Sequence, residues 1–89
     1  MIDAEGPKIE FPCDYPIKIV GENRDAFTEQ VIELTRLHAP DLRDADVRVR
    51  ASREGTYCSV TITITATGEA QLKALFETLK EHPLVKMVL

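Results

Sequence analysis

The chain has 89 residues, of which 44% are hydrophobic and 29% are charged, and its formal net charge is −4. This length supports one domain with a single core, and no apolar run approaches the roughly 20 residues of a membrane-spanning helix. The net negative charge argues against nucleic-acid binding by the surface as a whole. The acidic amino terminus lacks the apolar stretch of a secretory signal, so we expect a cytoplasmic protein.

The amino-terminal part of the chain divides into an expected tail and a first strand. Residues 1–10 carry little apolar material and predict a flexible tail, which leaves residues 11–89 as a single domain. Ile17 and Ile19 alternate with Lys18 and Val20, a period of two that predicts a strand, and Gly21 ends the pattern.

A first helix is predicted from about Arg24 to His38. Asn23 is the expected cap at its start, because asparagine can accept a hydrogen bond from a free amide of the first turn. Pro40 ends it, since proline lacks an amide hydrogen and disfavours helical geometry before it. The inward face carries apolar or aromatic residues at spacings of four, three and four: Phe27, Val31, Leu34 and His38.

Two strands joined as a hairpin are expected next. The residues from Val47 to Ala51 alternate between apolar side chains and arginines, and Gly55 suits a turn position with positive φ. From Thr56 to Thr67 the chain alternates without a break between apolar and hydroxyl side chains, which predicts the central strand of a sheet.

The carboxyl-terminal part predicts a second helix and a last strand. The helix should run from about Glu69 to Glu81 with Thr67 as its cap, and the alternation from Val85 to Leu89 predicts a short strand.

The predicted order is βαββαβ, the ferredoxin-like arrangement of the α+β class. Right-handed crossovers then give a four-stranded antiparallel sheet of order 4-1-3-2 with two helices on one face. Burial of the apolar set under the helices assigns the following residues to the covered face: Ile17, Ile19, Val47, Val49, Val60, Ile62, Ile64, Val85 and Met87.

The other face of the predicted sheet collects basic and hydroxyl side chains and, on this assignment, no carboxylate. The candidate binding residues on it are Lys18, Arg48, Arg50, Tyr57, Thr61, Thr63 and Lys86, with Ser59 and Thr65 between them. One interpretation is a docking surface for a protein partner with an acidic surface or for a small anionic ligand. The other is a solvated face whose long basic stems cover the strands. A homodimer is a further alternative, in which like charges oppose the pairing of two such faces unless the acidic helix faces of a second subunit cover them.

Other chemistries find less support. RNA recognition on this topology needs aromatic residues on the sheet, and the central strand offers only Tyr57 at its start. Cys13 and Cys58 lie far apart without a metal-binding spacing, so we expect no metal and no cofactor. His38 and His82 each stand at a predicted helix end, where the helix dipole and packing explain them.

Catalysis is not expected either. Cys58 and Ser59 are nucleophiles in residue type, but no base accompanies them at a predictable distance, and Cys58 points inward. We therefore expect a protein that is not an enzyme.

The loop of Gly21, Glu22 and Asn23 is the alternative small-ligand site. Free amides at the start of the first helix could hold a small anion, although a lone glycine is also explained by a turn from strand to helix.

Several short segments resemble the YbeD family of small bacterial proteins. They are His38-Ala39-Pro40, Ser52 with Gly55 and Tyr57, the run Ser59 to Thr63, and the ending Val85 to Leu89. The resemblance runs from about Phe11 to Leu89. It implies a fold similar to ACT domains, regulatory modules that sense small molecules, and hence a regulatory or binding role. ACT effector sites use glycines in the loop before the first helix, and this chain has Gly21 but no second glycine after Asp25.

Overall fold

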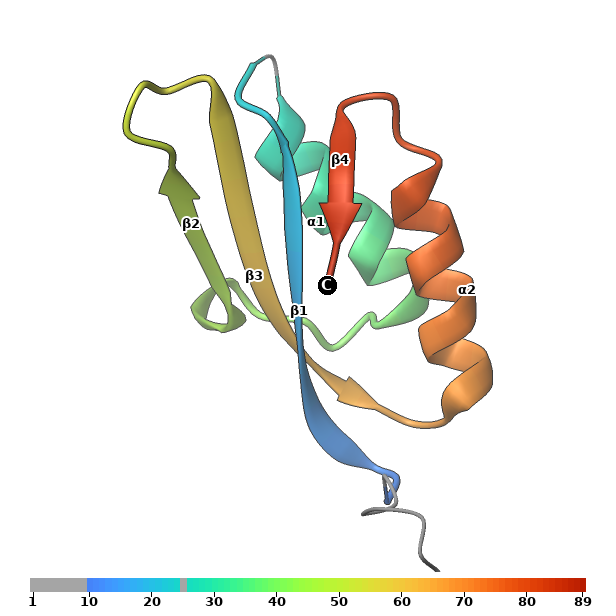
Figure 1. The fold of residues 1–89 in the computed structure, drawn as a ribbon. Coiled ribbons are helices and arrows are strands. Elements are labelled where there is room, and N and C mark those ends of the chain that lie inside the picture. The colour runs from blue at the N-terminus through green and yellow to red at the C-terminus, as the bar shows by residue number, and fades with distance from the viewer. Residues whose placement is uncertain (1–9, 25) are drawn as a thin grey trace, which may run out of the picture.

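The computed structural model describes residues 10–24 and 26–89, so the expected tail, apart from Glu10, lies outside the described residues. Figure 1 shows the fold. Its elements are β1 (Cys13–Glu22), α1 (Phe27–His38), a short 3₁₀ helix η1 (Asp44–Asp46), β2 (Val47–Ala51), β3 (Tyr57–Ala66), α2 (Glu69–Lys80) and β4 (Val85–Val88).

The strands form one antiparallel sheet in the order β2-β3-β1-β4, which confirms the predicted order and the ferredoxin-like fold. β1 and β3 are its centre and pair over ten residue pairs, from Cys13 with Ala66 to Glu22 with Tyr57. In Figure 1, α1 lies behind β1 and β4, α2 lies to the right of β4, and no helix covers the near face of the sheet.

The core fills the space between the covered face and the helices. The predicted alternation along β3 is confirmed, since Cys58, Val60, Ile62, Ile64 and Ala66 are all buried. The helices contribute residues at helical spacing: Phe27, Val31 and Thr35 from α1, and Leu72, Leu75 and Leu79 from α2. Among the described residues, no helix is both long and apolar enough to cross a membrane.

Two residues assigned to the covered face are exposed. Val49 is 52% exposed because β2 is an outer strand, and Figure 1 shows no helix behind it. Met87 is 48% exposed because the pairing of β4 with β1 shifts between Val20 and Gly21. The bulge places Met87 opposite Val20, a residue of the uncovered face, while Val85 lies opposite Gly21 on the covered one.

Neither predicted helix cap is present. The residue before α1 is Ala26, and the side chain of Asn23 instead donates a hydrogen bond to the carbonyl oxygen of Gly55 at 3.0 Å. The residue before α2 is Gly68, while the backbone amide of Thr67 donates to Oε1 of Gln71 at 2.7 Å. The hydroxyl of Thr67 also donates to Oε1 of Gln71, at 3.3 Å. In both places the side chain that the sequence suggested as a cap makes a different hydrogen bond.

The β3 alternation gives a direct stability test. Ile62 is fully buried, whereas its neighbour Thr63 is half-buried on the uncovered face. Ile62→Ala should lower the free energy of unfolding by about 2–5 kcal/mol, and Thr63→Ala by less than about 1 kcal/mol. Chemical denaturation of both variants measures this. Equal losses would mean that a second subunit or the amino-terminal segment covers the uncovered face.

Candidate functional site

The strand register brings three of the predicted cationic residues together on the uncovered face. Arg48 pairs with Thr61, and Thr61 pairs with Lys18, so these residues form one row across β2, β3 and β1. Arg50 pairs with Ser59 in the next row. Since neighbouring strands lie about 4.8 Å apart, the backbones of Arg48 and Lys18 are roughly 10 Å apart across the sheet. Long side chains from both can therefore reach one bound anion.

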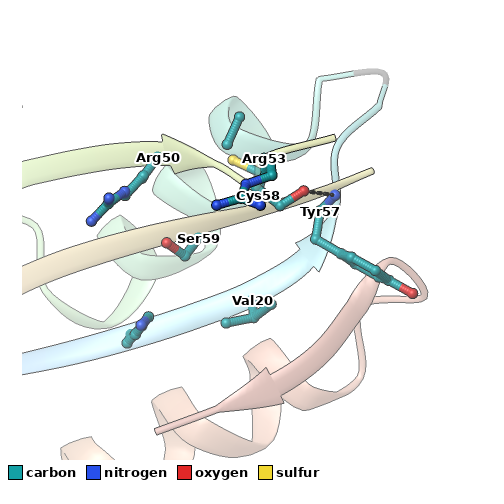
Figure 2. A pocket seen from close by; sticks show the side chains of 9 residues that line it. Val20, Arg50, Arg53, Tyr57, Cys58 and Ser59 are labelled. Atoms are coloured by element: carbon teal, nitrogen blue, oxygen red, sulfur yellow. Dashed lines mark hydrogen bonds between the residues drawn. The ribbon is translucent and has the colours of Figure 1, made fainter. Parts of the chain in front are cut away.

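A shallow hollow of about 630 Å³ opens between these rows and the β2–β3 hairpin. Figure 2 shows Arg50 on β2, Ser59 on β3 and Arg53 from the turn around it. Lys18 lines its other side from β1. Three cationic side chains thus border one hollow whose floor carries a serine hydroxyl, a combination suited to an anionic group.

Arg53 is a residue that sequence reasoning missed. The sequence placed it in the connection between two strands, outside the alternation that marks faces. A tight turn nevertheless keeps its residues beside both strand ends, and the amide of Gly55 donates to the carbonyl of Ser52 at 2.9 Å to close this one. We define the cationic face as Lys18, Arg48, Arg50 and Arg53.

The cationic face makes no ion pair with any carboxylate among residues 10–24 and 26–89. Four other basic side chains are paired: Arg24 and Lys86 with Glu22 at 3.3 and 3.2 Å, Arg36 with Asp44 at 3.1 Å, and Arg43 with Asp46 at 3.3 Å. Lys73 and Lys80 on α2, away from the sheet, have no ion-pair partner among the described residues either. Lys86, a predicted member of the binding surface, is therefore balanced by Glu22. On the sheet, the cations without a described ion-pair partner lie on β1, β2 and the hairpin turn.

The expectation that the uncovered face holds no carboxylate is wrong. β1 begins at Cys13 and extends to Glu22, so it is longer than the predicted strand at both ends. Asp14 then lies opposite Thr65, and Glu22 opposite Tyr57, both on the uncovered face. The face is acidic at the two ends of β1 and cationic between them, toward β2.

The remaining predicted residues lie around this centre. Tyr57 stands at the hairpin end of β3 and lines the hollow, while Thr61 lies between Arg48 and Lys18. Thr63 lies opposite Pro16, one row beyond the cations. The structure therefore groups Tyr57 and Thr61 with the cationic face and leaves Thr63 at its margin.

Arg43 and Asp46 form a charged pair just before β2. The guanidinium of Arg43, chiefly through its hydrogen bonds, holds the pKa of Asp46 below its ordinary value, and Asp46 raises the pKa of Arg43. Both groups are therefore ionised at neutral pH. The carboxylate of Asp46 binds Arg43 and not the arginines of β2.

The three residues of the alternative small-ligand loop all contact other parts of the protein. Gly21 is buried, and a Cβ there would overlap the ring of Phe27 and lie 2.6 Å from the carbonyl oxygen of Leu84. The carboxylate of Glu22 binds Lys86, and Asn23 binds the hairpin at Gly55. The glycine is explained by the close approach of an aromatic ring.

The two histidines join the helices. Nε2 of His38, at the end of α1, lies 3.0 Å from the hydroxyl of Thr78 in α2. That hydroxyl donates to the carbonyl of Ala74 at 2.9 Å, so the histidine is the donor of the first bond. His82 lies 2.6 Å through Nε2 from Oε1 of Gln30 in α1.

The two ring nitrogens of His82 have different hydrogen-bond roles. Its Nδ1 accepts the backbone amide of Leu84 at 3.1 Å, so the proton is on Nε2, which donates to Gln30. Among the described residues, no three His, Cys, Asp or Glu side chains are grouped as metal ligands.

The two candidate nucleophiles lie on opposite faces of β3. Cys58 is buried, with its sulfur 3.8 Å from the hydroxyl of Thr28, as the alternation predicts. Ser59 lies half-buried in the floor of the hollow, and no histidine lines that hollow.

The crowding at Gly21 gives a second stability test. Gly21→Ala should lower the free energy of unfolding by about 1–3 kcal/mol, because the added methyl group displaces the Phe27 ring or β4. Gly68→Ala is the matched control, since a Cβ there meets nothing and the change should stay within about 0.5 kcal/mol. Thermal or urea unfolding compares them. A neutral Gly21→Ala would show that the loop has room for a ligand.

The burial of Cys58 gives a kinetic test with an internal reference. Cys13 is half-buried near the start of β1, whereas Cys58 lies under the helices. A thiol reagent should therefore label native Cys13 well before Cys58, as measured on the Cys58→Ser and Cys13→Ser single variants. Equally rapid labelling of both thiols would place Cys58 at an accessible site.

The family comparison covers nearly the whole chain. Residues 6–89 match the family model described as a protein of unknown function, DUF493. A UPF0250 protein of Nitrosomonas europaea is 47% identical over 86 residues, which are 97% of this chain and 99% of that protein. A UPF0250 protein of Chromobacterium violaceum is 45% identical over 89 residues, all of both chains.

Solved structures with the same fold share much less sequence. The solution structure of protein HP0495 from H. pylori has a TM-score of 0.75 at 17% identity, covering 98% of this chain and 91% of that one. The ACT domain of a GTP pyrophosphokinase from Chlorobium tepidum has a TM-score of 0.63 at 20% identity, covering 86% and 97%. These likenesses establish an ACT-like fold.

Proposed function

The chain belongs to the DUF493 (UPF0250) family, as its resemblance to YbeD indicated, and we propose that it is a non-enzymatic interaction module that regulates an acidic protein partner by docking it on the cationic face. The observation that carries this proposal is the lack of an ion-pair partner for Lys18, Arg48, Arg50 and Arg53 among the described carboxylates, in a chain whose net charge is −4.

The cations of the cationic face can attract an acidic partner before contact and bind it in contact. A single exposed ion pair contributes only about 0.2–1 kcal/mol, so four cations act mainly together, by steering an acidic surface toward the sheet and fixing its orientation. Guanidinium groups add geometry, since each can bind a carboxylate through two hydrogen bonds. Such a surface selects partners by charge.

The shape of the site favours a protein over a small ligand. Small-molecule sites enclose most of their ligand's surface. The hollow beside Arg50 is open, and its cations are exposed rather than aimed into a buried chamber. A flat sheet face is better matched to a protein surface, which needs about 800 Å² on each partner.

The small-ligand alternative is an ACT-like sensor at the loop of Gly21, Glu22 and Asn23. The ACT-like neighbours give it a precedent in fold. The contacts of the loop oppose it, because Phe27 fills the space beside Gly21 and the polar groups of the other two residues already bind Lys86 and Gly55.

The histidine and cysteine side chains support two further parts of the proposal, that the protein is not an enzyme and that it is cytoplasmic. Both histidines bridge the helices, and Cys58, although it adjoins the hollow, is only 3% exposed. Cys13 and Cys58 lie near opposite ends of the β1–β3 pairing, too far apart to bond to each other, which suits a reducing cytoplasm.

The proposal is tested by reversing charge on the sheet. Arg48→Glu with Arg50→Glu should weaken binding of fluorescent poly-L-glutamate at low salt by at least about tenfold, because the variant repels the probe at the centre of the face. Both side chains are exposed on an edge strand, so the fold should be kept. Fluorescence anisotropy measures the affinity, and salt should weaken the wild-type complex most.

The matched control is Lys73→Glu with Lys80→Glu on α2, where both lysines are exposed. Each double variant changes the formal net charge by the same amount, from −4 to −8, since each of two cations becomes an anion. Because the two variants have the same net charge, the loss of affinity that comes from net charge alone should be the same in both. The control should show only that loss, to within about twofold, and should therefore bind far more tightly than the sheet variant. Equal weakening by both variants, or no binding by the wild type, would reject the cationic face.

A further inference from the structure

β2 is an edge strand whose outer side has no neighbour among the described elements. It pairs with β3 on one side over five consecutive residue pairs, without a register shift. Figure 1 shows it at the margin of the sheet, and every residue from Arg48 to Ala51 is exposed. A regular edge of this kind can template another strand, because its outer amides and carbonyls are unpaired.

The hydrogen-bond pattern identifies those unpaired groups. In an antiparallel ladder, hydrogen-bonded and non-hydrogen-bonded residue pairs alternate. The amide of Ser52 donates to the carbonyl of Tyr57 at 2.8 Å, which fixes the phase of the alternation. Arg50 and Arg48 then bond to β3, while the backbone groups of Val49 and Ala51 point to the outer edge.

The side chains along this edge alternate between charge and apolar surface. Arg48 and Arg50 lie on the uncovered face, in the rows of Thr61 and Ser59. Val49 lies on the opposite face and is 52% exposed. A strand added to β2 would therefore place every second side chain beside an arginine and the intervening ones beside Val49 and Ala51.

From this pattern we propose that β2 accepts an extended segment of the partner as an added strand, in which acidic residues alternate with apolar ones. The inference rests on the proposed docking of an acidic protein and specifies its mode. Backbone hydrogen bonds to Val49 and Ala51 supply the pairing, carboxylates opposite Arg48 and Arg50 supply selectivity, and apolar side chains cover Val49.

Charge favours this occupant over a second copy of the chain. Two β2 strands paired antiparallel about Val49 would put Arg48 of each copy opposite Arg50 of the other, and like charges directly opposite each other are destabilising. An acidic segment turns the same two positions into attractive pairs. The two arginines thus oppose the pairing of β2 with a second β2 and favour its pairing with an acidic strand.

The test uses two peptides of identical composition and wild-type protein. One peptide alternates glutamate with valine over seven residues, and its isomer holds the glutamates in one block and the valines in another. Docking by charge alone treats the two alike, whereas strand addition should favour the alternating peptide by at least about tenfold. A peptide that alternates lysine with valine should not bind.

Two changes then remove backbone pairing while the cations stay. Val49→Pro deletes an outward amide and leaves the bonds of Arg48 and Arg50 to β3, as proline permits on an edge strand. Methylation of alternate amide nitrogens in the glutamate–valine peptide makes the same test with unaltered protein, in case the proline variant does not fold. Each change should lower the affinity of the alternating peptide to that of its block isomer.

The outcomes separate the inference from the function beneath it. If both glutamate peptides bind equally and neither change matters, strand addition is wrong while acidic docking stands. If neither peptide binds, docking on the cationic face fails as well. If sedimentation shows a wild-type dimer that Val49→Pro dissociates, the edge belongs to a second copy and the acidic-strand inference is overturned.

Discussion

The pairing of β1 with β3 in one register is the constraint on which the rest of the molecule depends. Ten residue pairs hold these central strands together, and side chains alternate strictly between two faces along both. A slip by one residue would expose Ile62 and bury Thr61 beside Lys18, which costs both core packing and charge solvation. The same register places hydroxyls and cations together on the uncovered face.

The two outer strands present different edges. The pairing of β4 with β1 is bulged at Val20 and Gly21, and Lys86 is bound to Glu22. A bulge disrupts the regular row of backbone groups that another strand would pair with, and a charge that is already paired attracts a charged segment less. β2 pairs regularly, and its arginines have no described carboxylate partner. The asymmetry concentrates free positive charge and free backbone groups at one side of the sheet.

Local alternation predicted most of the fold because burial enforces it where helices cover the sheet. The residues from Val60 to Thr65 lie as their pattern indicates, and the crossover rules supplied the strand order. Alternation fails where its physical cause is absent. Val49 lies beyond the helices, and the bulge in β4 that turns Met87 outward has no signature in a four-residue strand.

The candidate site was predictable in part for the same reason. Lys18, Arg48 and Arg50 share a face because strands fix every second side chain, and their sequence positions suffice to show it. The charge balance around them was not predictable. The ion pair of Glu22 with Lys86 requires β1 to extend past Gly21, and Arg53 reaches the hollow through the shape of a turn.

The corner between β1 and α1 connects these observations to function. Asn23 donates to the carbonyl of Gly55 through its side chain and to that of Thr56 through its backbone amide, each at 3.0 Å. These bonds tie the β2–β3 turn to the central strand, so β2 is held in place although only β3 flanks it. A preorganised edge loses little freedom on binding, and the incoming segment alone bears the entropic cost of becoming a strand. An asparagine suggested by the sequence as a helix cap thus stabilises the edge that receives the partner.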